Sequence, residues 1–318
     1  MTTTSTVETV RGPVATDTLG KTLMHEHVFV LTPDSQANWN TDWDEQARVA
    51  DAVERLHALA ATGISTIVDP TVDGLGRYLP RIKGIADQVP ELNILVATGI
   101  YTYTDAPHYF EYRLGDPDPM TGLFVRDIRE GIQGTGVKAA LLKCAIDDKG
   151  LTAGVERVMR AVAQTNRETG TPIMVHTHPG SKTGLEVRRV LESEGVDSSR
   201  VQLAHSGDST DADHLAELAE AGYLLGMDRF GIDIILPFEQ RIDIVVEMCR
   251  RGYAASMVLS QDASCHIDWA APEMLALLPN WTYFHVLRDV VPTLLERGVS
   301  DADIEAMLVG NPRRWFEG

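Results

Sequence analysis

The chain has 318 residues, of which 44% are hydrophobic, and its 28 lysines and arginines against 46 aspartates and glutamates give a formal net charge of −18. A surface with this charge repels phosphate backbones and anionic membranes, so nucleic acid and membrane are not expected partners. The length suits the core of one α/β barrel, and we expect a single domain over residues 1–318.

Short apolar or β-branched runs recur at the spacing of βα units, and each is followed by a longer stretch with helical periodicity. Alternating strands and helices with near-continuous apolar strands indicate a parallel sheet that is covered on both faces. The predicted strands are Leu23 to Val30, Thr66 to Val72, Ile94 to Tyr101, Ala139 to Ile146, Ile173 to His178, Val201 to Ser206, Tyr223 to Arg229 and Met257 to Asp262.

The glycine pattern distinguishes a closed barrel from an open doubly wound sheet. An open sheet that binds a dinucleotide carries its glycine fingerprint directly after a strand. The dense cluster Gly131, Gly134 and Gly136 precedes the fourth predicted strand instead. We therefore predict an α/β fold of the (β/α)8 TIM-barrel type. The long connections 32–44, 102–122 and 263–280 follow strands and would meet at the C-terminal face, where such barrels build active sites.

The first predicted strand contains His25-Glu26-His27. Because side chains alternate along a strand, both imidazoles point to the same face, into the barrel. The pair alone is equally compatible with a metal site and with two satisfied core histidines, so further ligands must decide.

Three further candidates directly follow the apolar runs of later strands, each at the same relative place: His176, His205 and Asp262. His176 and His205 are 29 residues apart, about one βα unit, and Asp262 follows 57 residues later, about two units. Four histidines and one aspartate at the C-terminal ends of barrel strands form the ligand set that zinc, manganese or cobalt accepts. This alignment favours a metal centre over independent core histidines.

Lys143 closes the apolar run 139–142 of the fourth predicted strand, where an ammonium group would be buried beside cations. Such a charge is costly unless it is removed. Reaction of the neutral amine with carbon dioxide would give an anionic carbamate whose two oxygens could bridge two metals. The alternative is a lysine at the strand end that reaches solvent or a carboxylate.

Taken in chain order, these ligands resemble the phosphotriesterase family of the amidohydrolase superfamily, over essentially the whole chain. The neighbouring segments 24–27, 203–206 and 259–262 match the family as well. The resemblance implies a binuclear centre at the C-terminal face, with zinc as the first expectation and cobalt, manganese or iron as alternatives. It places His25, His27 and Asp262 on one metal and His176 and His205 on the other, with carboxylated Lys143 and a hydroxide as bridges.

The resemblance also assigns roles around the metals. His178 shares the facing of His176, but the family places its ligand first, so His178 is expected outside the ligand set. Asp262 is expected to accept the proton that the attacking water releases. Asp208 resembles the family's relay carboxylate, although a solvated loop aspartate would look the same.

The third and seventh strands end in residues that resemble the lactonase branch of the family. Tyr101 stands where true triesterases carry tryptophan, and Arg229 lies where it could line the mouth. The last long loop carries Ile267, Trp269 and Met274, enough apolar surface to cover an acyl chain. An amphipathic helix packed on the barrel would have a similar composition.

The resemblance therefore implies a lactonase that hydrolyses N-acyl homoserine lactones, an activity that quenches quorum sensing, with promiscuous activity on organophosphate triesters. The alternatives are a hydrolase of other γ- or δ-lactones, a phosphotriesterase proper, or a non-catalytic barrel that only binds metal. Members that resemble this chain are commonly homodimers, and a homodimer is expected here.

Cysteine usage and the N-terminus bear on location. Three cysteines are too few and odd in number for a disulfide framework, which indicates a reducing compartment. Residues 1–10 lack the basic start and apolar run of a signal peptide, and no apolar stretch approaches the roughly 20 residues that span a bilayer. We therefore expect a cytoplasmic protein.

Overall fold

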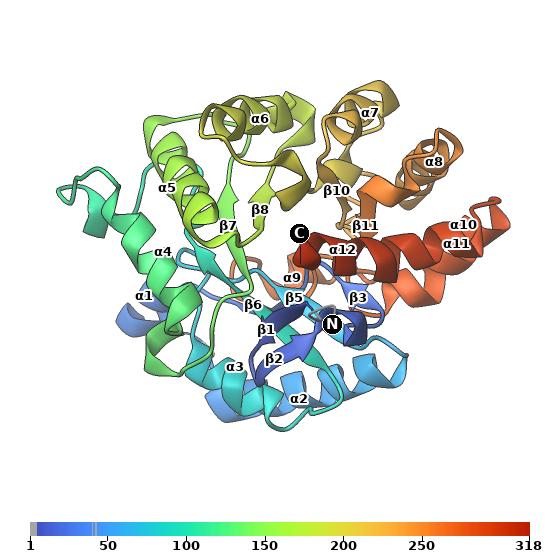
Figure 1. Ribbon diagram of the computed structural model, residues 1–318. Coiled ribbons are helices and arrows are strands. Elements are labelled where there is room, and N and C mark those ends of the chain that lie inside the picture. Colours follow the sequence, from blue (N-terminus) through green and yellow to red (C-terminus); the bar gives the residue numbers. More distant parts are fainter. Residues whose placement is uncertain (1–4, 40, 42) are drawn as a thin grey trace.

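Eight parallel strands form one sheet in the order β11-β10-β9-β8-β7-β6-β5-β3. The computed structural model describes residues 5–39, 41 and 43–318. Each strand lies beside the next along the chain, and the helices form a ring around the strands (Figure 1). The predicted (β/α)8 TIM barrel is confirmed.

The strands are short because only their central residues pair within the barrel. Their bounds are β3 (Thr22–Leu23), β4 (His27–Val30), β5 (Thr66–Asp69), β6 (Asn93–Gly99), β7 (Leu141–Ala145), β8 (Ile173–His176), β9 (Val201–Ala204), β10 (Leu224–Met227), β11 (Met257–Leu259) and β12 (Ser264–Ile267). A separate antiparallel hairpin, β1 (Thr6–Thr9) and β2 (Gly12–Ala15), precedes them.

The helices alternate with the strands and cover the outside of the sheet. They are α1 (Pro33–Asn38), α2 (Glu45–Ala61), α3 (Leu79–Ala86), α4 (Pro119–Arg129), α5 (Ala153–Thr169), α6 (Thr183–Ser193), α7 (Ala212–Glu220), α8 (Phe238–Arg250), α9 (Pro272–Leu275), α10 (Val291–Glu296), α11 (Asp301–Glu305) and α12 (Asn311–Glu317). Within the described ranges, no helix combines the length and apolar composition that a bilayer crossing requires.

The apolar core has two parts, as a closed barrel requires. The larger cluster fills the space between strands and helices, with Leu56, Val162 and Val245 as fully buried members. A second cluster includes Met24 and Met174. Successive residues of a strand, such as Ile67 and Val68, pack into different clusters. Because both sides of the strand are buried, its sequence is continuously apolar.

The first predicted strand, Leu23 to Val30, is two strands instead of one. β3 pairs with β5, whereas β4 pairs in parallel with β12, which the sequence had suggested was part of a loop. The chain changes neighbour at His25, whose carbonyl accepts from the Asp262 amide at 3.0 Å, and the His27 amide then donates to Ala263 O at 2.8 Å. These bonds bring the first and last strands of the barrel together and set the register of the residues that carry the site.

Two sequence-based expectations fall partly outside the described residues. The segment 1–10, which suggested the absence of a signal peptide, includes residues 1–4, and the predicted loop 32–44 includes residues 40 and 42. The described parts of the long connections contain α1 in the first, and β12 and α9 in the last.

The seam between the first and last strands depends on the buried Glu26 carboxylate. It accepts hydrogen bonds from Ser260 Oγ, the Gln261 amide and the Ala263 amide, each at 2.8 Å. All these donors would lose their partner if the carboxylate were removed, while a glutamine would still offer one oxygen.

Each buried donor left unpaired costs about 1–3 kcal/mol, so we expect Glu26→Ala to lower the free energy of unfolding by at least about 3 kcal/mol. Glu26→Gln should lose clearly less. Urea denaturation of the two variants beside the wild type measures both values. Equal stability of wild type and Glu26→Ala would show that the seam does not depend on this carboxylate.

Candidate metal centre

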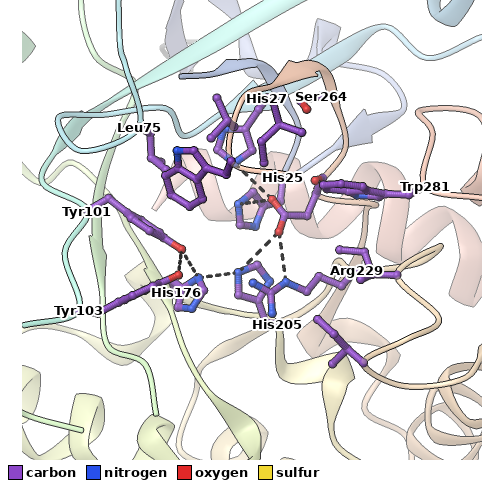
Figure 2. A pocket seen from close by; sticks show the side chains of 16 residues that line it. His25, His27, Leu75, Tyr101, Tyr103, His176, His205, Arg229, Ser264 and Trp281 are labelled. Atoms are coloured by element: carbon purple, nitrogen blue, oxygen red, sulfur yellow. Dashed lines mark hydrogen bonds and ion pairs between the residues drawn. The ribbon is translucent and has the colours of Figure 1, made fainter. Parts of the chain in front are cut away.

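The four predicted histidine ligands lie around one cavity at the C-terminal ends of the barrel strands (Figure 2), Asp262 lines the same cavity, and Lys143 lies directly beside His25. On one side, His25 Nε2 and His27 Nε2 lie 3.4 Å and 3.3 Å from Asp262 Oδ1. These three side chains point their ligand atoms at one small volume, as a cation site with nitrogen and oxygen ligands requires.

The other two histidines face each other across the same space. His176 Nδ1 lies 2.9 Å from His205 Nε2, and His205 Nε2 lies 3.9 Å from Asp262 Oδ2. His178 is placed elsewhere, because its Nδ1 accepts from the Ser181 amide and so caps the short turn Pro179–Ser181. The geometry therefore brings His176, and not His178, to the cluster.

Burial favours the neutral form of His176 and His205. It lowers the pKa of His176 to about 4, with Arg229 and Lys143 adding to the effect, and it holds the pKa of His205 well below its usual value. Neutral imidazoles have a free lone pair at neutral pH, which is the form that binds a metal.

Lys143 is 1% exposed and its Nζ lies 3.4 Å from His25 Nε2. In the part of the chain that the structure describes, no carboxylate lies within ion-pair distance of this nitrogen. Burial lowers the pKa of Lys143 to about 8, which brings the reactive neutral amine within reach near neutral pH. Lys143 is thus a buried amine that faces a predicted ligand histidine and is readily neutralised.

The backbone around the cluster is held in unusual conformations. His205 and Asp262 have positive φ angles of 69° and 55°, a region that costs non-glycine residues about 1–3 kcal/mol. Hydrogen bonds offset this cost, because the Asp262 amide is bound by His25 O and the His205 amide by Asp228 Oδ1. Gly99 is needed beside Lys143, since a Cβ there would lie 1.9 Å from the Lys143 carbonyl oxygen.

A cavity of ≈ 240 Å³ opens above these ligands. The Tyr101 hydroxyl lies at its base, 3.0 Å from His176 Nδ1 and in contact with the Tyr103 hydroxyl. Apolar side chains, among them Ile232, Ile267 and Trp269, also line the cavity. The cavity is lined by His25, His27, Val30, Leu75, Tyr101, Tyr103, His176, His205, Arg229, Ile232, Ile235, Asp262, Ser264, Ile267, Trp269 and Trp281.

Not all predicted substrate contacts reach this cavity. Ile267 and Trp269 line it, and the Trp269 ring lies 6.0 Å from that of Tyr101. Met274, in contrast, exposes 53% of its surface. It lies in the short helix α9 and is not among the residues that line the cavity. Met274 therefore does not line this cavity, and its contact with the substrate stays a prediction.

Arg229 connects the cluster to the surrounding loops. Its Nε donates to Asp262 Oδ2 at 3.2 Å and its Nη1 to Asp208 Oδ2 at 3.0 Å. Asp208 also accepts from Arg241 Nη1 at 2.5 Å, and its side chain is only 7% exposed. Asp208 is therefore a buried ion-pair partner of two arginines and not a solvated loop aspartate.

Several residues of the site were missed in the sequence. Asp228 contacts both His25 and His205, Asp147 contacts His176, and Thr71 contacts His27. Asp228 and Asp147 follow barrel strands, which is the signal that revealed His176 and could have revealed them. Tyr103 and Trp281 lie in loops, where no periodic pattern predicts the direction of a side chain.

Comparison with known proteins gives consistent matches over the whole chain. The model of the phosphotriesterase family matches residues 5–316. A phosphotriesterase homology protein of Mycobacterium tuberculosis is 54% identical over 98% of this chain and 97% of its own length. An aryldialkylphosphatase of Saccharolobus solfataricus is 36% identical over 94% of this chain and 95% of its own. A mutant PTE-like lactonase of Deinococcus radiodurans superimposes with a TM-score of 0.90 at 32% identity, covering 98% and 99% of the two chains.

The cluster predicts that activity depends on bound metal. We expect about two divalent ions per chain, reversible loss of activity on chelation, and a drop in both metal content and turnover in Asp262→Ala. Elemental analysis of the purified proteins measures the metal content. Asp148→Ala, which changes an exposed aspartate outside the predicted ligand set, is the control and should keep both metals. Full activity after exhaustive chelation would contradict the prediction.

Proposed function

This chain belongs to the phosphotriesterase family of metal-dependent hydrolases, and on that premise we propose that it is a lactonase acting on N-acyl homoserine lactones, with weaker activity on organophosphate triesters. The observation that carries the proposal is the Tyr101 phenol beside the ligand cluster, at the base of a cavity with a polar floor and an apolar wall.

The family implies a binuclear divalent metal centre, and the His and Asp groups at the cavity floor suit it. We assign His25, His27 and Asp262 to one cation, His176 and His205 to the other, and carboxylated Lys143 to both, with zinc as the preferred metal. When bound, such a pair of cations activates water and polarises the ester carbonyl. The protein's own residues orient the substrate and move protons.

Tyr101 supplies a hydrogen-bond donor at the reacting ester. Burial and the neighbouring Tyr103 hydroxyl raise the pKa of Tyr101 well above its usual value, so the phenol keeps its proton at neutral pH. In lactone hydrolysis the water oxygen bonds to the carbonyl carbon, the ring carbon–oxygen bond breaks, and the ring oxygen takes up a proton. A phenol beside His176 is placed to hold that ring oxygen and to stabilise the charge that develops on it.

Asp262 is the acceptor for the proton that water releases. Its Oδ1 faces the two histidines of the first strand, while its Oδ2 is held by Arg229. Arg229 stays protonated at any relevant pH, so it cannot pass a proton onward. These contacts favour a role for Asp208 as the ion-pair partner that holds Arg229 in place. They argue against Asp208 as a carboxylate that relays a proton.

The apolar wall supports a substrate with an acyl chain. Ile232, Ile235, Ile267 and Trp269 all line the cavity, and Ile235 and Trp269 are half exposed. An acyl chain that covers these side chains would gain about 25 cal/mol for each Å² of apolar surface removed from water. This contribution would favour acylated lactones over bare ones.

A phosphotriesterase proper is the second candidate, because the aryldialkylphosphatase relative is 36% identical along nearly the full chain.

For the cellular location and the oligomeric state, we propose a cytoplasmic homodimer. The three free cysteines suit a reducing compartment, and exposed side chains such as Tyr112 and Leu114 offer apolar surface to a second copy.

A substrate panel separates these functions. We expect the highest kcat/KM on N-acyl homoserine lactones, lower values on simple γ- and δ-lactones, and the lowest on a phosphotriester, because only the first class uses both Tyr101 and the apolar wall. The measurement is initial rates of the metal-loaded protein on each class. A kcat/KM for the triester above that for every lactone would favour the second candidate. No turnover of any substrate would favour a non-catalytic metal-binding barrel.

The Tyr101→Trp variant, assayed on the same substrates, tests the role of the Tyr101 hydroxyl. It keeps an aromatic ring but removes the hydroxyl beside His176, so it should depress lactone hydrolysis more than triester hydrolysis. Equal losses on both substrates would deny Tyr101 a lactone-specific role.

The carboxylated state of Lys143 has its own test. Lys143→Ala removes the proposed bridge, so it should lose metal and activity, and a short carboxylic acid added to the buffer should restore part of both. Lys149→Ala, at an exposed loop lysine, should behave as the wild type. Full activity of Lys143→Ala without any added carboxylate would rule out the bridge.

A further inference from the structure

One buried carboxylate contacts a ligand of each proposed cation. Asp228 Oδ2 lies 2.9 Å from His25 Nδ1, and Asp228 Oδ1 lies 3.0 Å from His205 Nδ1. Asp228 is 0% exposed and lies directly after β10. His25 belongs to the group with His27 and Asp262, whereas His205 faces His176 on the other side.

The remaining ligand histidines have partners of their own. His27 Nδ1 lies 2.7 Å from Thr71 Oγ1, which in turn contacts Asp69. His176 Nε2 lies 2.6 Å from Asp147 Oδ2. Each of these contacts supports one histidine, so Asp228 differs from them in serving two.

A backbone hydrogen bond and the space beside Gly226 set the position of the Asp228 side chain. The His205 amide donates to Oδ1 at 2.7 Å, so the carboxylate is tied to the backbone of one ligand as well as to its ring. Gly226 leaves room for the other oxygen, since a Cβ at this position would lie 2.4 Å from Asp228 Oδ2. The glycine is part of β10 and its φ is not in the positive region, so the requirement is for space alone.

A carboxylate only accepts hydrogen bonds, so each histidine must carry its proton on Nδ1 to satisfy Asp228. The lone pair of both rings is then on Nε2, the atom that faces Lys143 in His25 and His176 in His205. Without Asp228, each buried ring could place its proton on either nitrogen, and for each ring one of these two tautomers would block the ligand atom.

We propose that Asp228 is a positioning residue that sets the tautomer and ring orientation of one ligand in each half of the centre, so that both cation sites depend on the same carboxylate. The proposal rests on the metal centre of the proposed function but not on its substrate. A metal-binding measurement therefore tests it even if the protein proves not to be a lactonase.

The test compares metal affinities of Asp228→Asn and Asp147→Asn. Metal-free protein is titrated with Co²⁺ in competition with a chelator to give two stepwise dissociation constants, and ¹¹³Cd NMR of the loaded protein reports each site as a separate resonance. Loss of an outer carboxylate typically weakens metal binding about 10- to 100-fold. We expect Asp228→Asn to raise both metal dissociation constants about 10- to 100-fold and to shift both ¹¹³Cd resonances. Asp147→Asn should raise only one dissociation constant and shift only one resonance.

Gly226→Ala offers a second variant that keeps the carboxylate. Its methyl group would displace Oδ2, which faces His25, while the His205 amide still holds Oδ1. We expect the larger loss of affinity at the site of His25, with the other resonance moving less. This variant also keeps the proposal testable if Asp228→Asn does not fold, which urea denaturation of the metal-free proteins would reveal.

The proposal is overturned if Asp228→Asn weakens only one of the two sites or leaves both constants at their wild-type values. It is equally overturned if Gly226→Ala folds normally and changes neither site. Loss of affinity in both constants and shifts of both cadmium resonances, with Asp147→Asn confined to one, would support it.

Discussion

The site depends on the seam where the first and last strands of the barrel meet. A hydrogen bond from the Asp262 amide to His25 O sets the register between these strands, and the buried Glu26 carboxylate holds the segment on both sides of Asp262. Asp262 has a positive φ at this point, so its side chain turns toward His25 and His27. A slip of one residue would reverse the facing of every ligand on the first strand.

The same region concentrates polar groups that a core would normally exclude. Lys143, Asp228 and the four histidines are buried, and an isolated buried ammonium or imidazolium is costly. The protein reduces this cost in two ways. It keeps His176, His205 and Lys143 neutral or easily neutralised, and it pairs outer ring nitrogens with carboxylates. His27 differs, because hydrogen bonds to Asp262 and Asp69 raise its pKa to about 9, so a cation bound there would have to displace a proton from this ring.

Much of the fold could be predicted because burial imposes a pattern on the sequence. Continuous apolar runs marked the strands, and polar residues at their ends, such as His176 and His205, marked the rim. The pattern could not reveal the break after Leu23 or the strand Ser264–Ile267, because both result from a change of neighbour at the seam. Nor does it predict where side chains outside the strands point, so the pattern indicated a place at the cavity for Met274, which lies in α9 and does not line it, and gave no sign of Tyr103, which does.

The central claim is that six side chains from five strands hold two cations in one place. Crystals of the metal-loaded protein, measured at the absorption edge of the bound metal, test it most directly. Two anomalous peaks about 3.5–4 Å apart, between the imidazoles of His25 and His205 and with extra density on Lys143 Nζ, would agree with the account. A single peak, a peak remote from these residues, or an unmodified lysine between two cations would contradict it.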